Sequence, residues 1–375
     1  MVLLGVVDAE VAFFSERTGV DWNVIFLLLG MMVIVSVVKQ TGVFDYLAIW
    51  AAKRTRGRPF PTMVLLVCIT ALASALLDNV TTVLLVAPVT LLVCDRLAVT
   101  PVPFLIAEVL ASNIGGTATL IGDPPNIIIA SRAGLTFNDF LVNLAPIVLL
   151  LMVVFIGLCW VLFRKQLRYD PERVAALMAL DERDVISDRG LLVRSGVVLA
   201  AVMVGFVAHS ALQIEPSLVA LLGAGALVAI SRLEAKEFLA EVEWSTLVFF
   251  MGLFVMVGAL VEVGAMDRVG EAVTQAVGDR YLLASSVLLG GSALISGIVD
   301  NIPYVATMTP LVQDLVAGNG STRRDTSDWV QRFRDGDAGY RTDEKWWAAA
   351  REHDEKAPKP KLERERKRRR HDDVR

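Results

Sequence analysis

The feature that most constrains this chain is the length of its uncharged apolar stretches. They run over residues 22–38, 141–163, 195–208, 217–230, 244–261 and 281–299. Several approach the roughly 20 residues with which a helix crosses a bilayer. The chain is also 55% hydrophobic and only 20% charged, whereas soluble domains have about 45–50% apolar and about 25% charged residues. The sequence therefore predicts an all-α, multi-pass integral membrane protein surrounded by lipid, and not a soluble enzyme.

An internal repeat runs through the chain at one fixed spacing. Trp22 recurs as Trp244, and the same spacing of 222 residues relates two further sets of positions. The first set is Gly30, Val33, Val35, Gly42 and Asp45, which recur as Gly252, Val255, Val257, Gly264 and Asp267. The second is Ser74, Asp78, Asn79, Val83 and Pro88, which recur as Ser296, Asp300, Asn301, Val305 and Pro310. One register over both sets indicates two copies of one structural unit.

Charge placement indicates how the two copies are oriented. The loop after the first apolar run is basic and holds Lys53, Arg54, Arg56 and Arg58. Its partner in the second copy is balanced and holds Asp267, Arg268, Glu271, Asp279 and Arg280. Because basic loops stay in the cytoplasm, the two loops are expected on opposite sides of the membrane. This is the inverted-topology repeat of many secondary transporters.

The repeat and the loops together predict an order of elements. The first repeat, 1–164, is expected to hold a scaffold helix at 22–39, a re-entrant hairpin at 61–97, a broken helix at 103–131 and a helix at 141–164. A cytoplasmic connector follows at 165–193. The second repeat, 194–317, is expected to hold helices at 194–210, 217–231 and 244–263 and a hairpin at 281–317. Residues 318–375 are polar and are expected to form a disordered or frameshifted tail.

Polar residues in the middle of each predicted hairpin are the first candidates for a transport site. Asp78, Asn79, Thr81 and Thr82 interrupt the first apolar segment, and Asp300 and Asn301 interrupt the second. A charged residue at mid-membrane costs about 2.5–3.5 kcal/mol on insertion scales, so it normally faces a cavity or a partner. Asp and Asn also cap the helix that follows them, and both roles can hold together.

The predicted broken helix supplies the second set of candidates. Gly115, Gly116, Gly122, Pro124 and Pro125 interrupt a segment that is otherwise apolar. Gly frees the backbone and Pro removes an amide donor, and irregular backbone at membrane depth survives only where it lines a cavity or is buried in protein. The polar side chains of this break are Asn113, Thr117, Thr119, Asp123 and Asn126. A simple packing kink is the alternative.

Other acidic residues and the cysteines leave further alternatives. Two intramembrane aspartates could form a protease dyad, but Asp78 and Asp300 recur with the same Asn, Val and Pro companions, as duplicated ion sites should. Glu108 and Glu262 lie in apolar runs, where each could carry a proton or form a buried hydrogen bond. The three cysteines show no C-x-x-C spacing, so no thiolate metal site is expected.

Two segments carry a resemblance to a known family. LLDNVTTVLLVAPVTL and NIGGTATLIGDPPNIIIAS resemble signature segments of the ion transporter superfamily. They are most similar to one branch of this superfamily, which holds arsenite permeases, NhaD-type sodium/proton antiporters and P protein. The members of this branch share a citrate transporter-like domain. The resemblance covers about residues 1–318. It implies an elevator-type fold, with two hairpins and two broken helices moving against a scaffold, and a substrate between the hairpin tips. The resemblance to dicarboxylate transporters further implies sodium held by asparagine side chains and loop carbonyls, here at Asn79 and Asn301, and no other metal is expected.

The chain departs from that family pattern in two places. Residues 194–222 have no counterpart before Met1, and the partner of Asn113–Asn126 should fall at 335–348, where the chain reads DGDAGYRTDEKWWA. We therefore expect a chain truncated at both ends, without the second broken helix. A nonfunctional remnant is accordingly one of the alternatives for its function.

The sequence predicts a secondary active transporter of the plasma membrane. No Walker motif is present to bind ATP. On family grounds, efflux of arsenite or a related small anion comes first. Sodium/proton antiport is second because Asp78, Asp123 and Asp300 supply carboxylates, and a citrate-like organic-anion carrier is third. A channel or binding protein is the alternative from another class. The expected coupling ion is sodium or a proton, with no other cofactor. Expected partners are lipid, a homodimer mate and, for arsenite transport, an ATPase subunit, but no nucleic acid.

Overall fold

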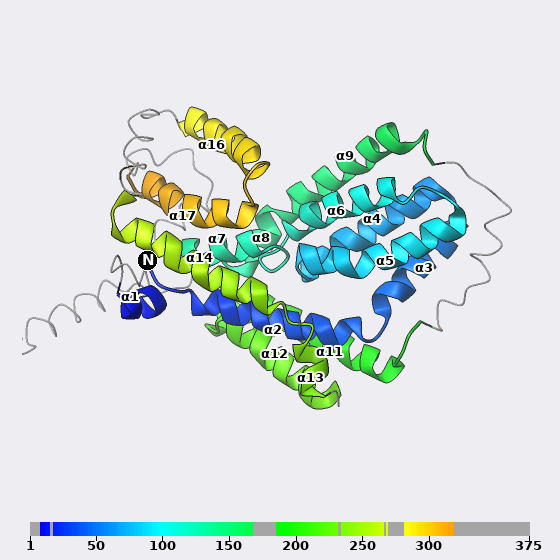
Figure 1. Ribbon diagram of the computed structural model, residues 1–375, viewed down its shortest axis with the longest axis horizontal. Coiled ribbons are helices and arrows are strands. Elements are labelled where there is room, and N and C mark those ends of the chain that lie inside the picture. The colour runs from blue at the N-terminus through cyan, green and yellow to red at the C-terminus, as the bar shows by residue number, and fades with distance from the viewer. Residues whose placement is uncertain are drawn as a thin grey trace, which may run out of the picture.

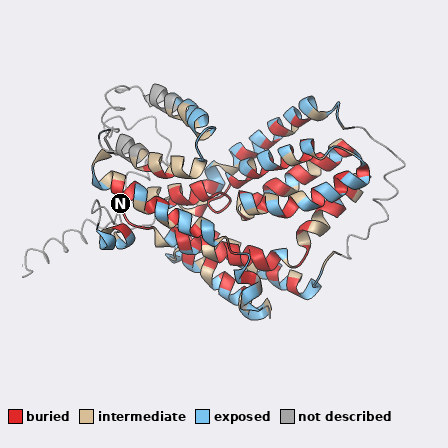
Figure 2. Ribbon diagram, in the orientation of Figure 1, coloured by how far each residue is buried: buried red, intermediate tan, exposed pale blue. Residues whose placement is uncertain are grey.

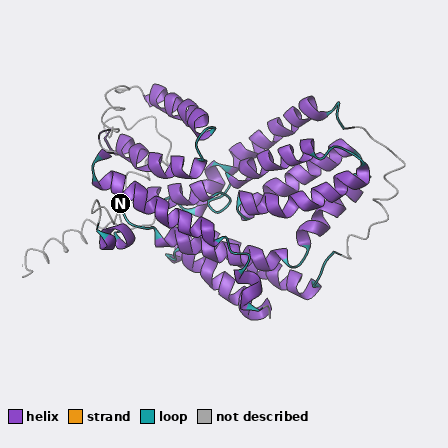
Figure 3. Cartoon of the chain, in the orientation of Figure 1, coloured by secondary structure: helices purple, strands orange, loops and turns teal. Residues whose placement is uncertain are grey.

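The computed structural model describes residues 8–15, 18–167, 185–231, 234–265, 268 and 281–318, and this part of the chain consists of helices joined by loops and turns (Figure 3). Six of its helices are long and apolar enough to cross a membrane. They are α2 (Trp22–Lys39), α4 (Pro59–Leu76), α5 (Asn79–Leu97), α9 (Ala145–Phe163), α11 (Arg189–Leu212) and α14 (Trp244–Glu262). The predicted all-α membrane fold is confirmed, and the protein is a multi-pass membrane protein.

Helix α2 is the centre of the larger apolar core. It packs against α11, α14 and α12 (Pro216–Ser231). Gly30 allows the close approach of α12, since a Cβ atom on Gly30 would lie 2.9 Å from the Cβ of Ala220. The helix begins where the Asp21 side chain accepts a hydrogen bond from the amide of Val24, 3.2 Å away. Its burial therefore follows from contact with helices of the second half of the chain.

A second apolar core joins helices of the first half. It is formed by α3 (Val43–Arg54), α4, α5, α6 (Val102–Gly116) and α9. Figure 1 shows these helices as one bundle at the right of the molecule. Helix α9 leaves most of its side chains exposed (Figure 2), as expected of a helix that faces lipid. Helix α3 was not predicted from the sequence. Its last turn contains Lys53 and Arg54, which belong to the segment predicted as a basic loop.

Two helical hairpins enter the molecule from opposite sides. The first is α4 and α5, with Leu77 and Asp78 at the turn. The second is α16 (Tyr281–Ser296) and α17 (Asn301–Gly318), with residues 297–300 at the turn. In Figure 1 the two turns lie toward the middle of the molecule, near the start of α7 (Pro124–Ala133). The assignment of the two hairpins to inverted repeats stays a prediction.

The remaining described elements are short. They are α1 (Ala9–Phe14), α8 (Phe137–Asn143) and α13 (Ala235–Leu239). Helix α11 begins at Arg189, inside the connector predicted at 165–193, because the side chain of Asp188 accepts hydrogen bonds from the amides of Gly190 and Leu191. Residues 168–184 of that connector, and the predicted tail beyond Gly318, lie outside the described residues.

Candidate ion- and solute-binding site

The first hairpin tip is held by hydrogen bonds within the turn and to α6. Asp78 is the N-cap of α5, and its Oδ1 accepts a hydrogen bond of 2.8 Å from the amide of Thr81. The Oγ of Ser74 donates to the carbonyl oxygen of Ser112 on α6 at 2.7 Å. The capping role suggested by the sequence is therefore real, and it fixes the Asp78 carboxylate at the turn.

A pair of asparagines joins this tip to the broken helix. The Nδ2 of Asn79 donates to the Oδ1 of Asn113 at 2.8 Å. Asn79 is 9% exposed, and its own Oδ1 is buried with no hydrogen-bond partner among the described residues. The same holds for the Oγ1 of Thr82, one turn further along α5. Since buried polar atoms are normally hydrogen-bonded, these two oxygens mark a place suited to a ligand.

The broken helix consists of α6 and α7 with seven non-helical residues, 117–123, between them. The Nδ2 of Asn126 donates to two carbonyl oxygens of the break, those of Gly116 at 3.2 Å and Thr119 at 2.9 Å. The Oγ1 of Thr119 donates to the carbonyl oxygen of Ala75 and accepts a hydrogen bond from the amide of Gly122. These bonds satisfy backbone groups that the interrupted helix leaves unpaired.

The glycines of the break allow it to lie directly against the first hairpin. A Cβ atom on Gly115 would lie 2.2 Å from the carbonyl oxygen of Ala71 on α4. A Cβ on Gly122 would lie 2.5 Å from the carbonyl oxygens of both Gly116 and Ser74, and Gly116 is equally restricted by Gly122. No larger residue fits at these positions without backbone movement. The glycines therefore shape the site and offer no side chain to a ligand.

Asp123 occupies the most buried acidic position of this region. Its side chain is 8% exposed, and it makes no hydrogen bond within the described residues although it occupies the N-cap position of α7. The negative charges of Asp78 and Asp300 both act on it. The structure thus brings the predicted carboxylates of Asp78 and Asp300 close enough to Asp123 for their charges to act on it. Among the described residues, however, no three acidic, His or Cys side chains lie close enough together to ligate one metal ion.

Within the described residues, the helices of the tip site place no basic side chain beside these negative charges. On α4, α5, α6, α7 and α17, the described basic residues are Arg96 and Arg132, each in the last turn of its helix. Arg132 is nine residues from Asp123, about 13 Å along a helix axis. Its guanidinium lies over the ring of Phe254 on α14, 5.6 Å from the centroid. The positive charge on α7 is therefore held at the end away from the site.

The second hairpin tip is more open than the first. Asp300 is exposed, and its Oδ1 accepts a hydrogen bond of 2.9 Å from the amide of Ile302. Asn301 is half-buried, and its side chain forms no hydrogen bond in the described part of the chain. Helix α17 packs against α7. The second tip therefore contributes the negative charge of Asp300, but it lacks a side-chain pair like that between Asn79 and Asn113.

The other predicted residues lie at the edge of the site. Thr117 is exposed, and its Oγ1 donates to the carbonyl oxygen of Asn113. Thr81 contributes its amide to the cap on Asp78. Sequence reasoning did not assign a role to Ser74 or Ser112, whose hydrogen bond ties the tip to α6. The recurrence of Ser74 as Ser296 was the signal that could have identified it. We define the tip site as Asp78, Asn79, Thr82, Asn113, Asp123, Asn126 and Asp300.

Comparison with known proteins identifies the family. A family model described as citrate transporter matches residues 1–330. The chain belongs to the citrate transporter family. The match extends beyond residue 317, the predicted end of the second repeat.

Individual relatives agree with this assignment. A Mycobacterium tuberculosis protein named as an uncharacterized transporter is 60% identical over 332 residues, which cover 88% of this chain and 77% of the relative. A Mycobacterium leprae protein named as a 46 kDa membrane protein is 57% identical over 317 residues, or 84% of this chain and 74% of that one. The mouse P protein is 33% identical over 373 residues, which cover 79% of this chain and 45% of the P protein.

Membership of the citrate transporter family establishes the broad activity. The chain is a membrane transporter, as predicted, and the resemblance to the P protein branch of the ion transporter superfamily is confirmed. The family and the names of its relatives indicate a carrier for a small molecule. The names of these relatives specify no solute. The roles of the tip-site residues stay predictions.

Proposed function

We propose that this chain is a secondary active transporter whose coupling cation, sodium or a proton, binds at the tip site. One observation carries the proposal: among the described residues, the buried Asp123 carboxylate and the buried Oδ1 of Asn79 have no hydrogen-bond partner, and the helices that form the tip site place no described basic side chain beside them. A bound cation would supply the missing partner for both atoms.

The cost of unpaired charge explains why a cation is the expected ligand. Burying a carboxylate without a partner costs several kcal/mol, even after the protein relaxes. Carboxylate, amide and carbonyl oxygens are the ligands that hard cations prefer. A proton would instead bind directly to the Asp123 carboxylate. Both ions neutralise the site, and both are available as transmembrane gradients.

The charge of the tip site also orders the candidate solutes. Arsenous acid is uncharged at neutral pH, so the three carboxylates do not repel it, and we retain arsenite efflux as the first candidate. The family description favours citrate as the second. A free citrate trianion would meet Asp78, Asp123 and Asp300 with no arginine or lysine to pair with, so it would have to enter with a cation. Sodium/proton exchange needs no further solute.

The two hairpins suggest how access alternates. The tip site lies between α5 and α17, which belong to hairpins that enter from opposite sides, and the broken helix formed by α6 and α7 (Figure 1). A movement of these elements against α2, α11 and α12 would expose the site to one side at a time, the arrangement common to inverted-repeat transporters.

Flux into proteoliposomes made with the purified full chain tests this proposal. We would impose an inward sodium gradient or a pH gradient and follow radioactive sodium, citrate and arsenite. The expected result is accumulation of at least one of these above its equilibrium level, which disappears when an ionophore dissipates the gradient. Flux that never exceeds equilibrium and ignores the gradient would instead indicate a channel and contradict the proposal.

A further inference from the structure

A second buried acidic residue lies outside the tip site. Glu108 is in the middle of α6, and its side chain is 1% exposed. Its Oε1 is 2.6 Å from the Oγ1 of Thr90 on α5, and Thr90 is fully buried. Its Oε2 is buried and has no hydrogen-bond partner in the part of the chain that the structure describes. One of the two carboxyl oxygens is therefore hydrogen-bonded and the other is not, inside the second apolar core.

The helices around Glu108 bring no charge to balance it. Helix α6 packs against α4, α5 and α9. The ionisable side chains on α4 and α9 are thiols only, exposed Cys68 and buried Cys159. On α5 the buried Cys94 feels the charge of Glu108, while Asp95 and Arg96 are exposed at the end of the helix. An unpaired carboxylate in such surroundings is expected to take up a proton and become neutral.

A structural role alone is a poor account of this residue. A charged side chain at mid-membrane is costly on insertion scales. One hydrogen bond to a hydroxyl offsets only part of that cost. A glutamine would make the same hydrogen bond without an ionisable group. What glutamate adds at this position is the ability to gain and lose a proton.

We propose that Glu108 is a second ion site, which binds and releases one proton during transport. The proton joins the unpartnered Oε2, the carboxylate becomes the neutral acid, and release returns the proton to water with no change of redox state. Glu108 is five residues before Asn113 on the same helix, about 7–8 Å along its axis. Proton binding would therefore change the charge beneath the tip site. The proposal does not depend on which ion or solute the tip site takes.

Infrared spectroscopy of the full chain in lipid tests this site without a known solute. We would record the carbonyl band of protonated carboxylic acids while the pH is changed across the range in which the protein stays folded. Subtracting the spectra of Glu108→Gln from those of the wild type isolates the band of Glu108. We expect this band to appear on acidification and to vanish at alkaline pH. A band present at every pH, or at none, would overturn the proposal.

A second variant identifies the band without removing the carboxyl group. Thr90→Val deletes the hydroxyl partner but keeps the side-chain volume, so we expect the Glu108 band to shift in frequency and still to titrate. If Glu108→Gln fails to fold, this shift serves as the assignment, and a carboxylic acid band that neither shifts nor titrates would overturn the proposal. Since the measurement requires no flux, its outcome is separate from that of the tip-site experiment.

Discussion

At the scale of single residues, the tip site combines two kinds of position. Gly115, Gly116 and Gly122 allow close approach of the backbone, while Asn79 and Asp123 present acceptors that have no hydrogen-bond partner among the described residues. The sequence predicted that both kinds of residue belong to the site. It could not predict that Asn79 pairs with Asn113, because that hydrogen bond depends on how the hairpin packs against the broken helix.

The close contact at Gly115 gives a stability prediction. Gly115→Ala places a methyl group 2.2 Å from the carbonyl oxygen of Ala71, so α4 and α6 must separate. Overpacking of this kind typically costs about 1–3 kcal/mol. We expect a lower midpoint of thermal unfolding in detergent. The matched control is Gly157→Ala on α9, where a Cβ meets nothing within 4 Å and the midpoint should stay level or rise. Equal midpoints for the two variants would contradict the packing described for Gly115.

At the scale of elements, the sequence predicted interruptions better than contacts. Glycines and prolines marked the break between α6 and α7, since neither residue type supports a continuous helix there. The start of α11 at Arg189 was not predicted, although Asp188 is a typical N-cap. Helix α3 was not predicted either, because a basic segment signals a loop by charge even where its backbone is helical.

Asn126 gives a prediction for the broken helix as an element. Its Nδ2 serves the carbonyl oxygens of Gly116 and Thr119, so Asn126→Ala leaves two buried acceptors without this donor. Each loss costs about 1–3 kcal/mol. We expect a clearly lower unfolding midpoint together with reduced transport. Asn143→Ala on α8 removes an exposed amide that bonds only the carbonyl oxygen of Asp139, and it should change stability by less than about 0.5 kcal/mol. A neutral Asn126→Ala would show that the break is held by other contacts.

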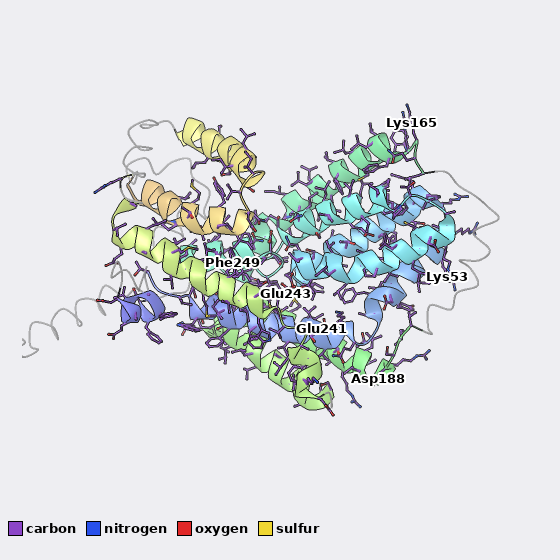
Figure 4. All side chains as sticks on the ribbon, viewed as in Figure 1. Lys53, Lys165, Asp188, Glu241, Glu243 and Phe249 are labelled. Carbon is purple, nitrogen blue, oxygen red and sulfur yellow. The ribbon has the colours of Figure 1, made fainter. Side chains whose placement is uncertain are left out.

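At the scale of the whole molecule, the fold places the basic C-terminal ends of α3 and α9 on one side. Figure 4 shows Lys53 and Lys165 at the same end of the molecule, and Asp188 at the start of α11. Glu241 joins Lys39 through an ion pair of 2.5 Å at the end of α2. Both partners of this pair are more than a third exposed, so the pair adds little stability. By the positive-inside rule we expect this side to face the cytoplasm.

This orientation predicts which positions a membrane-impermeant thiol reagent can reach. In a background with the native cysteines replaced, Lys53→Cys and Lys165→Cys should be labelled only from the cytoplasmic side. Gln213→Cys, at the far end of α11, should be labelled only from outside. Comparing intact cells with inverted vesicles measures this directly. Labelling of all three from one side would contradict this orientation and the crossing of the membrane by α11.

The central claim, that negative charge at the tip site binds the coupling cation, is tested most directly by a matched pair of Asp→Asn variants. Asp78 and Asp188 both cap helices, and Asn caps as well as Asp, so neither variant should lose stability. Only Asp78→Asn removes charge from the tip site. Gradient-driven flux in proteoliposomes should fall at least about tenfold in Asp78→Asn, a change of about 1.4 kcal/mol, and stay at the wild-type level in Asp188→Asn. Wild-type flux in both variants would contradict the claim.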